Sequence, residues 1–322
     1  MLKRLLITAA ILMFAQGSYA ATWDMSCHDV EDNYHTKNAR LFAAEVEKLS
    51  GGDLKIDIKS NSVLLKRHET KRGVQRGVGP IAEFLISALG NENPLFEVDA
   101  VPFIATNFQD AWKLWLASKP YYKKLLEKDG LLMFYSESWP PQGIYTKQAV
   151  TDKTQFKGVR FRSYNASVSR VAELLGAIPA TIESSEVPQA FATGVVSAML
   201  TSSTTGVNTQ AWDYVKYYYD ARAFLTKNVI LVNKVAYDKL TDRAKKALQE
   251  ASDAAEKRGW KMAEESMKKD LETLASRGMQ VLPPPPGLKK DLEEIGQVML
   301  QEWLKKAGND GKALVEAYKK MK

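Results

Sequence analysis

The sequence has very few residues that could form disulfides or bind metals. It contains one cysteine, Cys27, and three histidines, His28, His35 and His68. A single cysteine cannot form an internal disulfide, so the fold must depend on its hydrophobic core. We interpret Cys27 as a buried structural residue, with a catalytic thiol as the alternative. No histidine pair has the helical spacing of metal ligands, so we expect no metal site.

The sequence also lacks the motifs of common enzyme classes. It has no G-x-S-x-G nucleophile elbow, no G-x-x-x-x-G-K phosphate loop and no dinucleotide-binding glycine pattern. Glu137 and Asp152 are isolated carboxylates, which carry little information about catalysis. We therefore expect no catalytic residues and no cofactor, and a protein that is not an enzyme. A secreted hydrolase that uses Glu137 or Cys27 is the less favoured alternative.

Long hydrophobic runs are absent after the first twenty residues. Those residues, MLKRLLITAAILMFAQGSYA, combine a positively charged start, an apolar segment and small residues before Ala21. This pattern is typical of a cleavable secretory signal peptide, and its apolar part is too short to span a bilayer. We therefore expect export and cleavage after Ala20.

Basic residues only slightly outnumber acidic residues. The formal net charge of +7 falls to +5 when Lys3 and Arg4 are removed with the signal peptide. This excess favours an anionic small molecule or an acidic partner surface, and it is too diffuse to indicate a nucleic acid. A solvated basic surface without a specific partner is the alternative.

Helical and strand periodicities alternate along the mature chain. Apolar residues at helical spacing predict a helix over residues 35–49, and strict alternation predicts a strand in DLKIDIKSN, residues 53–61. Residues 241–277 predict one long helix capped by Thr241, which would extend about 55 Å at about 1.5 Å per residue. Alternating strands and helices predict an α/β protein, and the chain length is typical of two domains.

One predicted strand carries two arginines on the same face. In FKGVRFRSYNAS, residues 156–167, alternation places Arg160 and Arg162 on one side of the strand. A buried guanidinium needs a partner. From the residues alone, that partner is either a ligand or a carboxylate of the protein such as Glu137 or Glu186.

The arginine strand also carries a family resemblance. FKGVRFRSYN, followed by LLGAIPATIESSEVPQAFATGVVSAM, resembles the central signature of the TRAP-type (tripartite ATP-independent periplasmic) solute-binding proteins. Phe191 stands where the family has leucine, and Ser197 replaces the usual aspartate. The segments FAAEVEKLSGGDLKIDI, GVQRGV, VDAVPFI and LVNKVAYDKLTDRAKKALQEAS extend the similarity, in the family's order, over most of the mature chain.

The resemblance implies an α/β fold of the two-domain periplasmic-binding-protein clamshell type, with mixed sheets, hinge strands and one long domain-spanning helix. After a signal peptide of residues 1–20, the N-terminal ligand-binding lobe would comprise residues 21–140 and 227–270. The C-terminal lobe would comprise residues 141–226 and 271–322.

The resemblance further implies a periplasmic receptor. It would hold a small organic acid in the cleft between the lobes, close around it, and deliver it to TRAP membrane subunits driven by an ion gradient. We expect a monomer. A clamshell receptor that serves an ATP-driven importer or a sensor kinase is the alternative.

The family's specificity arginine falls on Arg162, whose planar guanidinium can donate two parallel hydrogen bonds to a carboxylate. Several family members that bind sugar acids carry a second arginine at the place of Gln142, and a further polar contact falls near Thr201 or Ser202. One carboxylate flanked by neutral hydrogen-bonding groups therefore fits better than a dicarboxylate. Aromatic, short aliphatic and sugar acids remain open as ligands.

Aromatic residues near these positions predict a flat apolar wall, with packing in the core as the alternative. They are Trp139, Tyr145, Tyr164 and Trp212. In the N-terminal lobe, four residues occupy positions where family members can contact the ligand: Glu31, Asn33, Arg67 and Glu83. Glu31 or Glu83 would matter if the ligand carried an amine. The predicted ligand-binding residues are Arg162, Trp139, Gln142, Tyr164, Asn165, Ser184, Thr201, Ser202, Trp212, Glu83, Arg67, Glu31 and Asn33.

Overall fold

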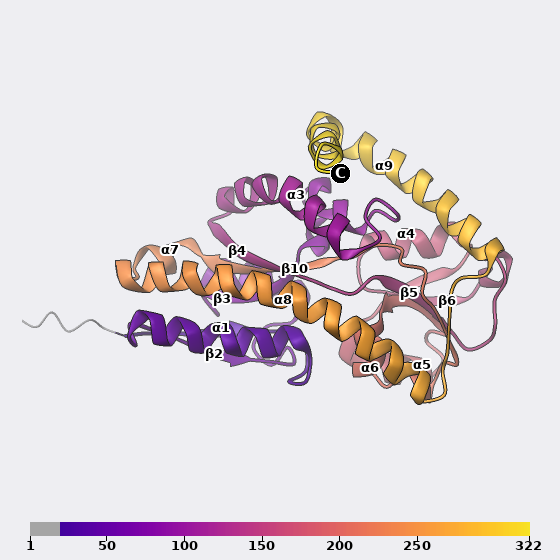
Figure 1. The fold of residues 1–322 in the computed structure, drawn as a ribbon, viewed down its shortest axis with the longest axis horizontal. Coiled ribbons are helices and arrows are strands. Elements are labelled where there is room, and N and C mark those ends of the chain that lie inside the picture. Colours follow the sequence, from indigo (N-terminus) through magenta and orange to yellow (C-terminus); the bar gives the residue numbers. More distant parts are fainter. Residues whose placement is uncertain (1–19) are drawn as a thin grey trace, which may run out of the picture.

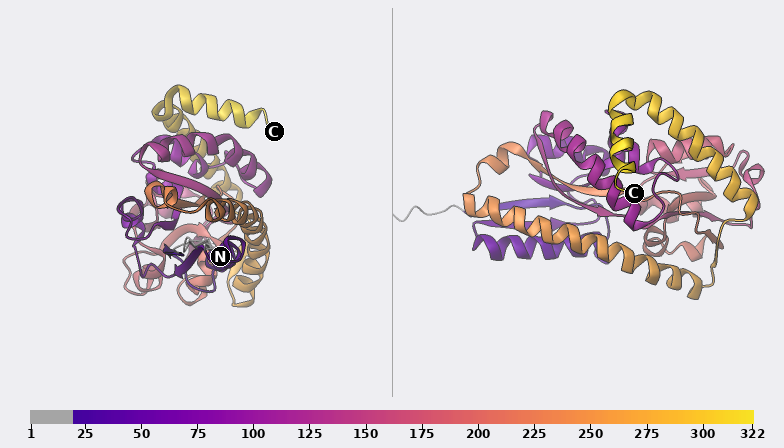
Figure 2. Two further views of the ribbon diagram at one scale, coloured as in Figure 1. Left: turned by 90° about the vertical axis from the view of Figure 1, so that its left-hand side faces the viewer. Right: turned by 45° about the horizontal axis from the view of Figure 1, so that its top comes forward.

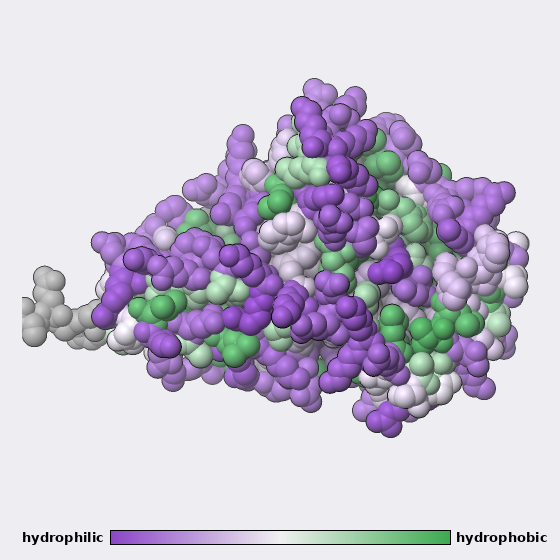
Figure 3. All heavy atoms as spheres, viewed as in Figure 1, coloured by the Kyte–Doolittle hydropathy of each residue, from purple (hydrophilic) through white to green (hydrophobic). Residues whose placement is uncertain are grey.

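The computed structural model describes residues 20–322. The predicted signal peptide therefore lies, except for Ala20, outside the described residues. Within residues 20–322, none of the helices has the length and apolar character needed to span a membrane. The face shown in Figure 3 is mostly hydrophilic with smaller apolar patches, as expected when the hydrophobic cores lie between sheets and helices.

The first of two sheets has five strands in the order β2-β1-β3-β10-β4. They are β1 (Ala21–Ser26), β2 (Leu54–Lys59), β3 (Ile81–Leu85), β4 (Leu131–Ser138) and β10 (Lys227–Asn233). Strands β1, β2 and β3 are parallel, and β10 runs antiparallel to both β3 and β4. The sheet is therefore mixed, and β10, which lies between β3 and β4, comes from a distant part of the chain.

The second sheet has six strands in the order β11-β9-β5-β8-β6-β7. They are β5 (Gln142–Thr146), β6 (Arg160–Ser163), β7 (Ile178–Thr181), β8 (Ala198–Ser202), β9 (Tyr217–Tyr219) and β11 (Gln280–Leu282). Strand β6 is parallel to β7 and β8, whereas β5 is antiparallel to β8 and β9. The predicted arginine strand thus lies inside this sheet.

Two neighbouring chain segments, between β4 and β5 and between β9 and β10, connect the sheets. The Trp139 N–H donates to the Thr226 carbonyl (2.8 Å), and the Gln142 N–H donates to the Phe224 carbonyl (3.0 Å). These hydrogen bonds join the two segments where they pass from one sheet to the other. The crossings therefore correspond to the hinge strands expected for a clamshell.

Helices cover both faces of the first sheet (Figure 1). The helices are α1 (Tyr34–Ser50), α2 (Thr70–Arg76), α3 (Phe108–Lys128), α4 (Ala166–Leu174), α5 (Val187–Ala192), α6 (Ser203–Asn208), α7 (Lys234–Asp238), α8 (Asp242–Ser276) and α9 (Pro286–Lys319). Helices α1 and α8 share one hydrophobic core with this sheet, and α3 contributes to another on the opposite side. Cys27 is fully buried in the core beneath α1.

The predicted long helix is confirmed as α8, and Thr241 is its N-cap. It runs along much of the molecule and packs against α1 at one end and α6 at the other (Figure 1). At Gly259 a Cβ would come within 2.7 Å of the Glu137 Cγ atom. Glycine at this position therefore lets α8 approach β4 closely.

Helix α9 contacts both halves of the molecule (Figure 2). Its first part packs on the second sheet through Leu288 and Leu292, and its last part packs near α3 through Leu314 and Tyr318. The change of direction occurs at Gly308, whose φ of 59° and ψ of −140° are non-helical. We propose that the two sheets mark two lobes with the predicted boundaries, in which case the end of α9 packs against the N-terminal lobe.

Candidate ligand-binding site

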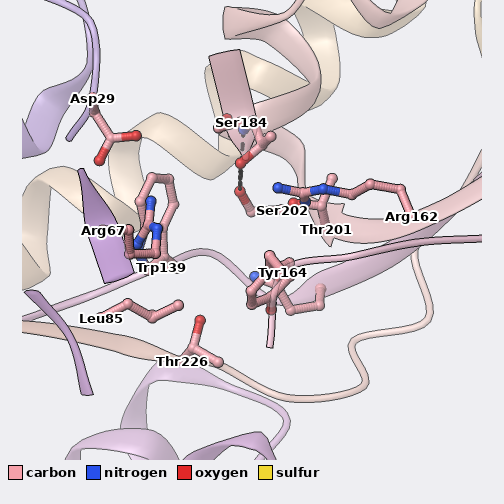
Figure 4. Close-up of a pocket in the computed structure, with 12 residues that line it drawn as sticks. Asp29, Arg67, Leu85, Trp139, Arg162, Tyr164, Ser184, Thr201, Ser202 and Thr226 are labelled. Atoms are coloured by element: carbon pink, nitrogen blue, oxygen red, sulfur yellow. Dashed lines mark hydrogen bonds between the residues drawn. The ribbon is translucent and has the colours of Figure 1, made fainter. Parts of the chain in front are cut away.

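A pocket lies between the two sheets, close to the chain crossings (Figure 4). Its empty volume is about 360 Å³, with the part open to solvent included. The lining residues are Asp29, Arg67, Leu85, Trp139, Gln142, Arg162, Tyr164, Ser184, Thr201, Ser202, Thr205 and Thr226.

Arg162 is the buried cation on the second-sheet side of the pocket. It lies in β6 between β7 and β8, and only 3% of it is exposed, whereas Arg160 on the same strand is exposed. Its Nε donates to the Ile182 carbonyl (3.0 Å), and its buried Nη1 has no hydrogen-bond partner. Burial lowers the pKa of Arg162 to about 10, so the guanidinium is charged at neutral pH.

The alternative protein partners of Arg162 are engaged elsewhere or exposed. Glu137 lies in the first sheet beside His35, with 3.0 Å between Oε2 and Nδ1. Glu186 is exposed at the end of a short 3₁₀ helix, η5 (Ser184–Glu186). Across residues 20–322, no acidic side chain forms an ion pair with Arg162. The guanidinium therefore has an unfilled hydrogen-bonding position.

Fixed polar and aromatic groups surround Arg162. Its guanidinium lies over the Tyr164 ring, 5.1 Å from the centroid, a distance suited to a cation–π contact. The Tyr164 hydroxyl donates to Gln142 Oε1 (2.9 Å), and Gln142 Nε2 donates to the Pro140 carbonyl (2.8 Å). These contacts hold the wall of the pocket in one arrangement.

The carboxyl end of β8 supplies neutral hydroxyl groups. Thr201 and Ser202 end the strand, and Ser202 caps α6 by accepting a hydrogen bond from the Thr205 N–H (3.1 Å). All three residues line the pocket. This side therefore offers neutral hydrogen-bonding groups beside a single charged group, Arg162.

Asp29 and Arg67 provide charges on the first-sheet side. Only 7% of Asp29 is exposed, and its Oδ2 has no hydrogen-bond partner. Burial, with the charge of Glu83 second, raises the pKa of Asp29 to about 6. Arg67 begins the 3₁₀ helix η1 (Arg67–Glu69). Its Nε donates to a carboxylate oxygen of Glu183 (3.2 Å), a residue on the second-sheet side of the pocket. This ion pair joins the two sides of the pocket.

Most of the residues predicted from the sequence line the pocket: Arg67, Trp139, Gln142, Arg162, Tyr164, Ser184, Thr201 and Ser202. Two others from the second-sheet side do not. Asn165 caps α4 through the Val168 N–H and donates to Ser87 Oγ (2.9 Å). Trp212 packs below Arg277, whose guanidinium lies 5.2 Å from its ring centroid.

Three predicted residues of the first-sheet side also lie outside the pocket lining. Glu31 is on the surface in an ion pair with Arg40, and Asn33 is the N-cap of α1. Glu83 is buried behind the pocket, where it accepts from Asn228 (2.7 Å). Each of these side chains has a hydrogen-bond or ion-pair partner in the protein.

Sequence reasoning missed Asp29, Leu85, Thr205 and Thr226 as lining residues. The position of Asp29 after the first strand could have indicated a role in ligand binding. Asp29 lies three residues beyond the end of β1, and ligands of open α/β sheets bind beyond the carboxyl ends of parallel strands. Leu85 ends β3, a neighbour of β1, so both residues reach the same edge of the sheet.

A second charged cluster lies directly behind the pocket wall. His35 Nδ1 is 2.9 Å from Glu83 Oε1 and 3.0 Å from Glu137 Oε2, and all three residues are buried. Burial would lower the pKa of His35, but the two carboxylates outweigh it and raise the pKa to about 10. Ligand atoms of the trio lie within 4.8 Å of one another, a spacing that could hold a metal ion. The raised pKa favours a proton on His35 instead.

Comparisons with known proteins agree on one family. The model of the bacterial extracellular solute-binding protein family 7 (DctP) matches residues 27–306. The crystal structure of Bordetella pertussis DctP7, an extracytoplasmic solute receptor described as binding pyroglutamic acid, is 51% identical with a TM-score of 0.92. The match covers 93% of this chain and all of DctP7.

Two further solved structures are similar. Bordetella pertussis DctP6, also described as binding pyroglutamic acid, is 41% identical over 93% of this chain and all of DctP6, with a TM-score of 0.91. A marine metagenome TRAP solute-binding protein, described as specific for pyroglutamate, is 37% identical with a TM-score of 0.92. That match covers 94% of this chain and 99% of the other.

These matches confirm the family predicted from the arginine strand and the two-domain α/β fold predicted with it. Proteins of this family are solute-binding receptors that work with TRAP transporters in the periplasm. This chain belongs to family 7 of the bacterial extracellular solute-binding proteins, the TRAP transporter receptors.

Proposed function

We propose that this receptor binds a small monocarboxylate, with pyroglutamate as the favoured ligand, and that Arg162 anchors the carboxylate. The observation that carries the proposal is the buried guanidinium of Arg162, whose Nη1 has no partner although it lines the pocket. Leaving a buried charged donor unpaired costs free energy. A ligand carboxylate would remove that cost and accept two parallel hydrogen bonds.

The charges of the pocket support one carboxylate rather than two. The charge of the other lining arginine, Arg67, is already balanced by Glu183, and Gln142, Thr201 and Ser202 around Arg162 are neutral. The three similar receptors described above bind pyroglutamate, which has one carboxylate on a small ring. Both observations favour the same size and charge of ligand.

Family membership supports delivery to TRAP membrane subunits driven by an ion gradient. Uptake measured in vesicles with the TRAP membrane subunits from the same organism tests this step. Uptake of labelled pyroglutamate should require the receptor and the ion gradient, and should continue without ATP. Uptake that stops when ATP is removed would favour the alternative, a receptor for an ATP-driven importer.

Isothermal titration calorimetry tests the carboxylate anchor. Arg162→Ala removes a charge-assisted pair of hydrogen bonds, and each is worth about 1.5–3 kcal/mol net. We therefore expect a loss of pyroglutamate affinity of about 100-fold or more. Arg160→Ala is the matched control because Arg160 lies on the same strand but is exposed. Wild-type affinity in the Arg162→Ala variant would show that the anchor is assigned to the wrong residue.

A further inference from the structure

The pocket contains a second buried polar group without a partner, and its charge is opposite to that of Arg162. Asp29 follows β1, is 7% exposed, and its buried Oδ2 accepts no hydrogen bond from any described residue. In Figure 4 Asp29 and Arg162 lie on opposite sides of the pocket. A buried carboxylate oxygen requires a donor. A ligand that fills this pocket must therefore supply an N–H or O–H group to Asp29 as well as an acceptor to Arg162.

Arg67, which lines the pocket together with Asp29, narrows the chemical identity of the ligand group that donates to Asp29. Arg67 lines the pocket on the same side as Asp29 (Figure 4). Arg67 uses Nε for Glu183 (3.2 Å), and its two terminal nitrogens form no hydrogen bond with the described residues. An acceptor and a donor side by side match the N–H and C=O groups of an amide. A free ammonium group suits the place less well, because it has no acceptor for the terminal nitrogens of Arg67.

Other acidic residues near the pocket cannot take this role. Glu31 is on the surface, paired with Arg40. Glu83 is buried behind the wall, where Asn228 donates to it and His35 lies beside it. The carboxylate that faces the pocket is therefore Asp29, a residue for which no ligand role was predicted from the sequence.

We propose that Asp29 and Arg67 together recognise an amide of the ligand, with Asp29 accepting its N–H and Arg67 donating to its carbonyl. Asp29 is then a specificity-determining residue. The ligand class is small carboxylates with a lactam or N-acyl amide, and carboxylates of equal size without an amide N–H are rejected. This inference rests on the proposed function, since it requires that Arg162 holds the carboxylate.

A pair of nearly identical ligands tests the inference on the wild-type mature chain. In the lactone 5-oxotetrahydrofuran-2-carboxylate, a ring oxygen replaces the N–H of pyroglutamate, while the carboxylate and the carbonyl remain. Calorimetry should show that pyroglutamate binds about 10- to 100-fold more tightly, because the lactone leaves Asp29 unpaired and facing a second acceptor. Proline, which has a cationic ring nitrogen and no carbonyl, should bind more weakly than pyroglutamate.

The Asp29→Asn variant assigns the discrimination to this residue. Its amide can donate to the ring oxygen of the lactone, so we expect the ratio of the two affinities to fall to within a few-fold. Asp32→Asn is the matched control, because Asp32 lies in the same loop with 96% of its side chain exposed. That variant should keep the wild-type ratio. Circular dichroism melting curves show whether each variant is folded, and the wild-type comparison does not depend on any variant.

The outcomes separate this inference from the proposed function. Equal wild-type affinities for pyroglutamate and the lactone, both lost in Arg162→Ala, would overturn the amide recognition and leave the carboxylate anchor intact. An unchanged ratio in Asp29→Asn would assign the discrimination to another residue and overturn the role of Asp29. If neither ligand nor any other small carboxylate binds the wild-type chain, the proposed function itself fails.

Discussion

Replacing His35 by glutamine should change how the stability of this receptor depends on pH. His35 lies between Glu83 and Glu137, with both Nδ1–oxygen distances at or below 3.0 Å and all three side chains buried. The carboxylates overcome the effect of burial and raise the pKa of His35 from 6.5 to about 10. Each unit of pKa difference between the folded and unfolded states corresponds to about 1.4 kcal/mol, so the whole shift corresponds to about 5 kcal/mol.

The sign of the effect follows from proton binding. Between pH 6.5 and 10 the folded state keeps the proton on His35 while the unfolded state loses it. The stabilisation is therefore complete below pH 6.5 and disappears as the pH rises through 10. The His35→Gln variant lacks this contribution, and at pH 6.5 it should be less stable than wild type by about 3–5 kcal/mol, the usual cost of removing one partner from a buried ionic group.

Urea denaturation at pH 6.5, 8 and 9.5 measures this difference. The free energy of unfolding of the wild type should fall by about 4 kcal/mol over this range relative to His35→Gln, so the two proteins converge at high pH. His68→Gln is the control, because the His68 side chain is 72% exposed, and it should follow the wild-type curve. A constant difference between wild type and His35→Gln at all three pH values would show that His35 is neutral in the folded protein.

The same variant should also affect the ligand pocket indirectly. The His35 ring packs against Trp139, with 4.3 Å between centroids, and Trp139 lines the pocket. Asn228 connects the two groups as well, because it accepts from Trp139 Nε1 (3.0 Å) and donates to Glu83 (2.7 Å). The cluster therefore helps to fix the position of the pocket wall.

Two further substitutions test other buried or bridging charges. Asp99 and Lys227 form an ion pair of 3.2 Å with both side chains fully buried. Denaturant unfolding should show that Asp99→Asn lowers the free energy of unfolding by about 3–5 kcal/mol. Adding Lys227→Met to the same chain should recover much of this loss. Wild-type stability of the Asp99→Asn single variant would refute the prediction. Glu183→Gln removes the link to Arg67 across the pocket, where the Glu183 side chain is 40% exposed. We expect pyroglutamate affinity to fall only about 2- to 5-fold, as for a partly exposed pair, with unchanged affinity in the exposed control Glu186→Gln; a 100-fold loss in calorimetry would instead mean that Glu183 contacts the ligand.

Much of the architecture could be predicted from local sequence patterns. The alternation in residues 54–59 and the helical spacing in residues 35–49 correspond to β2 and α1. The long helix begins after Thr241 as predicted. Such features depend on contacts between residues close in the sequence, so periodicity and capping residues are sufficient to identify them.

The candidate site could be predicted only in part. The strand pattern placed Arg162 on a face with Arg160, but it could not show that one is buried and the other exposed. It also could not decide whether Glu137, Glu186 or a ligand faces the guanidinium. That choice depends on how β6 is placed relative to β4, and these strands belong to different sheets.

Residues close together in the sequence were sufficient to identify the family, the α/β class and the arginine predicted to hold the carboxylate. Packing between distant elements brought Asp29 to the pocket, placed Glu83 behind the wall beside His35, and left Glu31 on the surface. The physical reason is that the direction of a side chain follows from its immediate neighbours along the chain. Which charges meet, and whether water reaches them, follows from the packing of elements that are distant in the sequence.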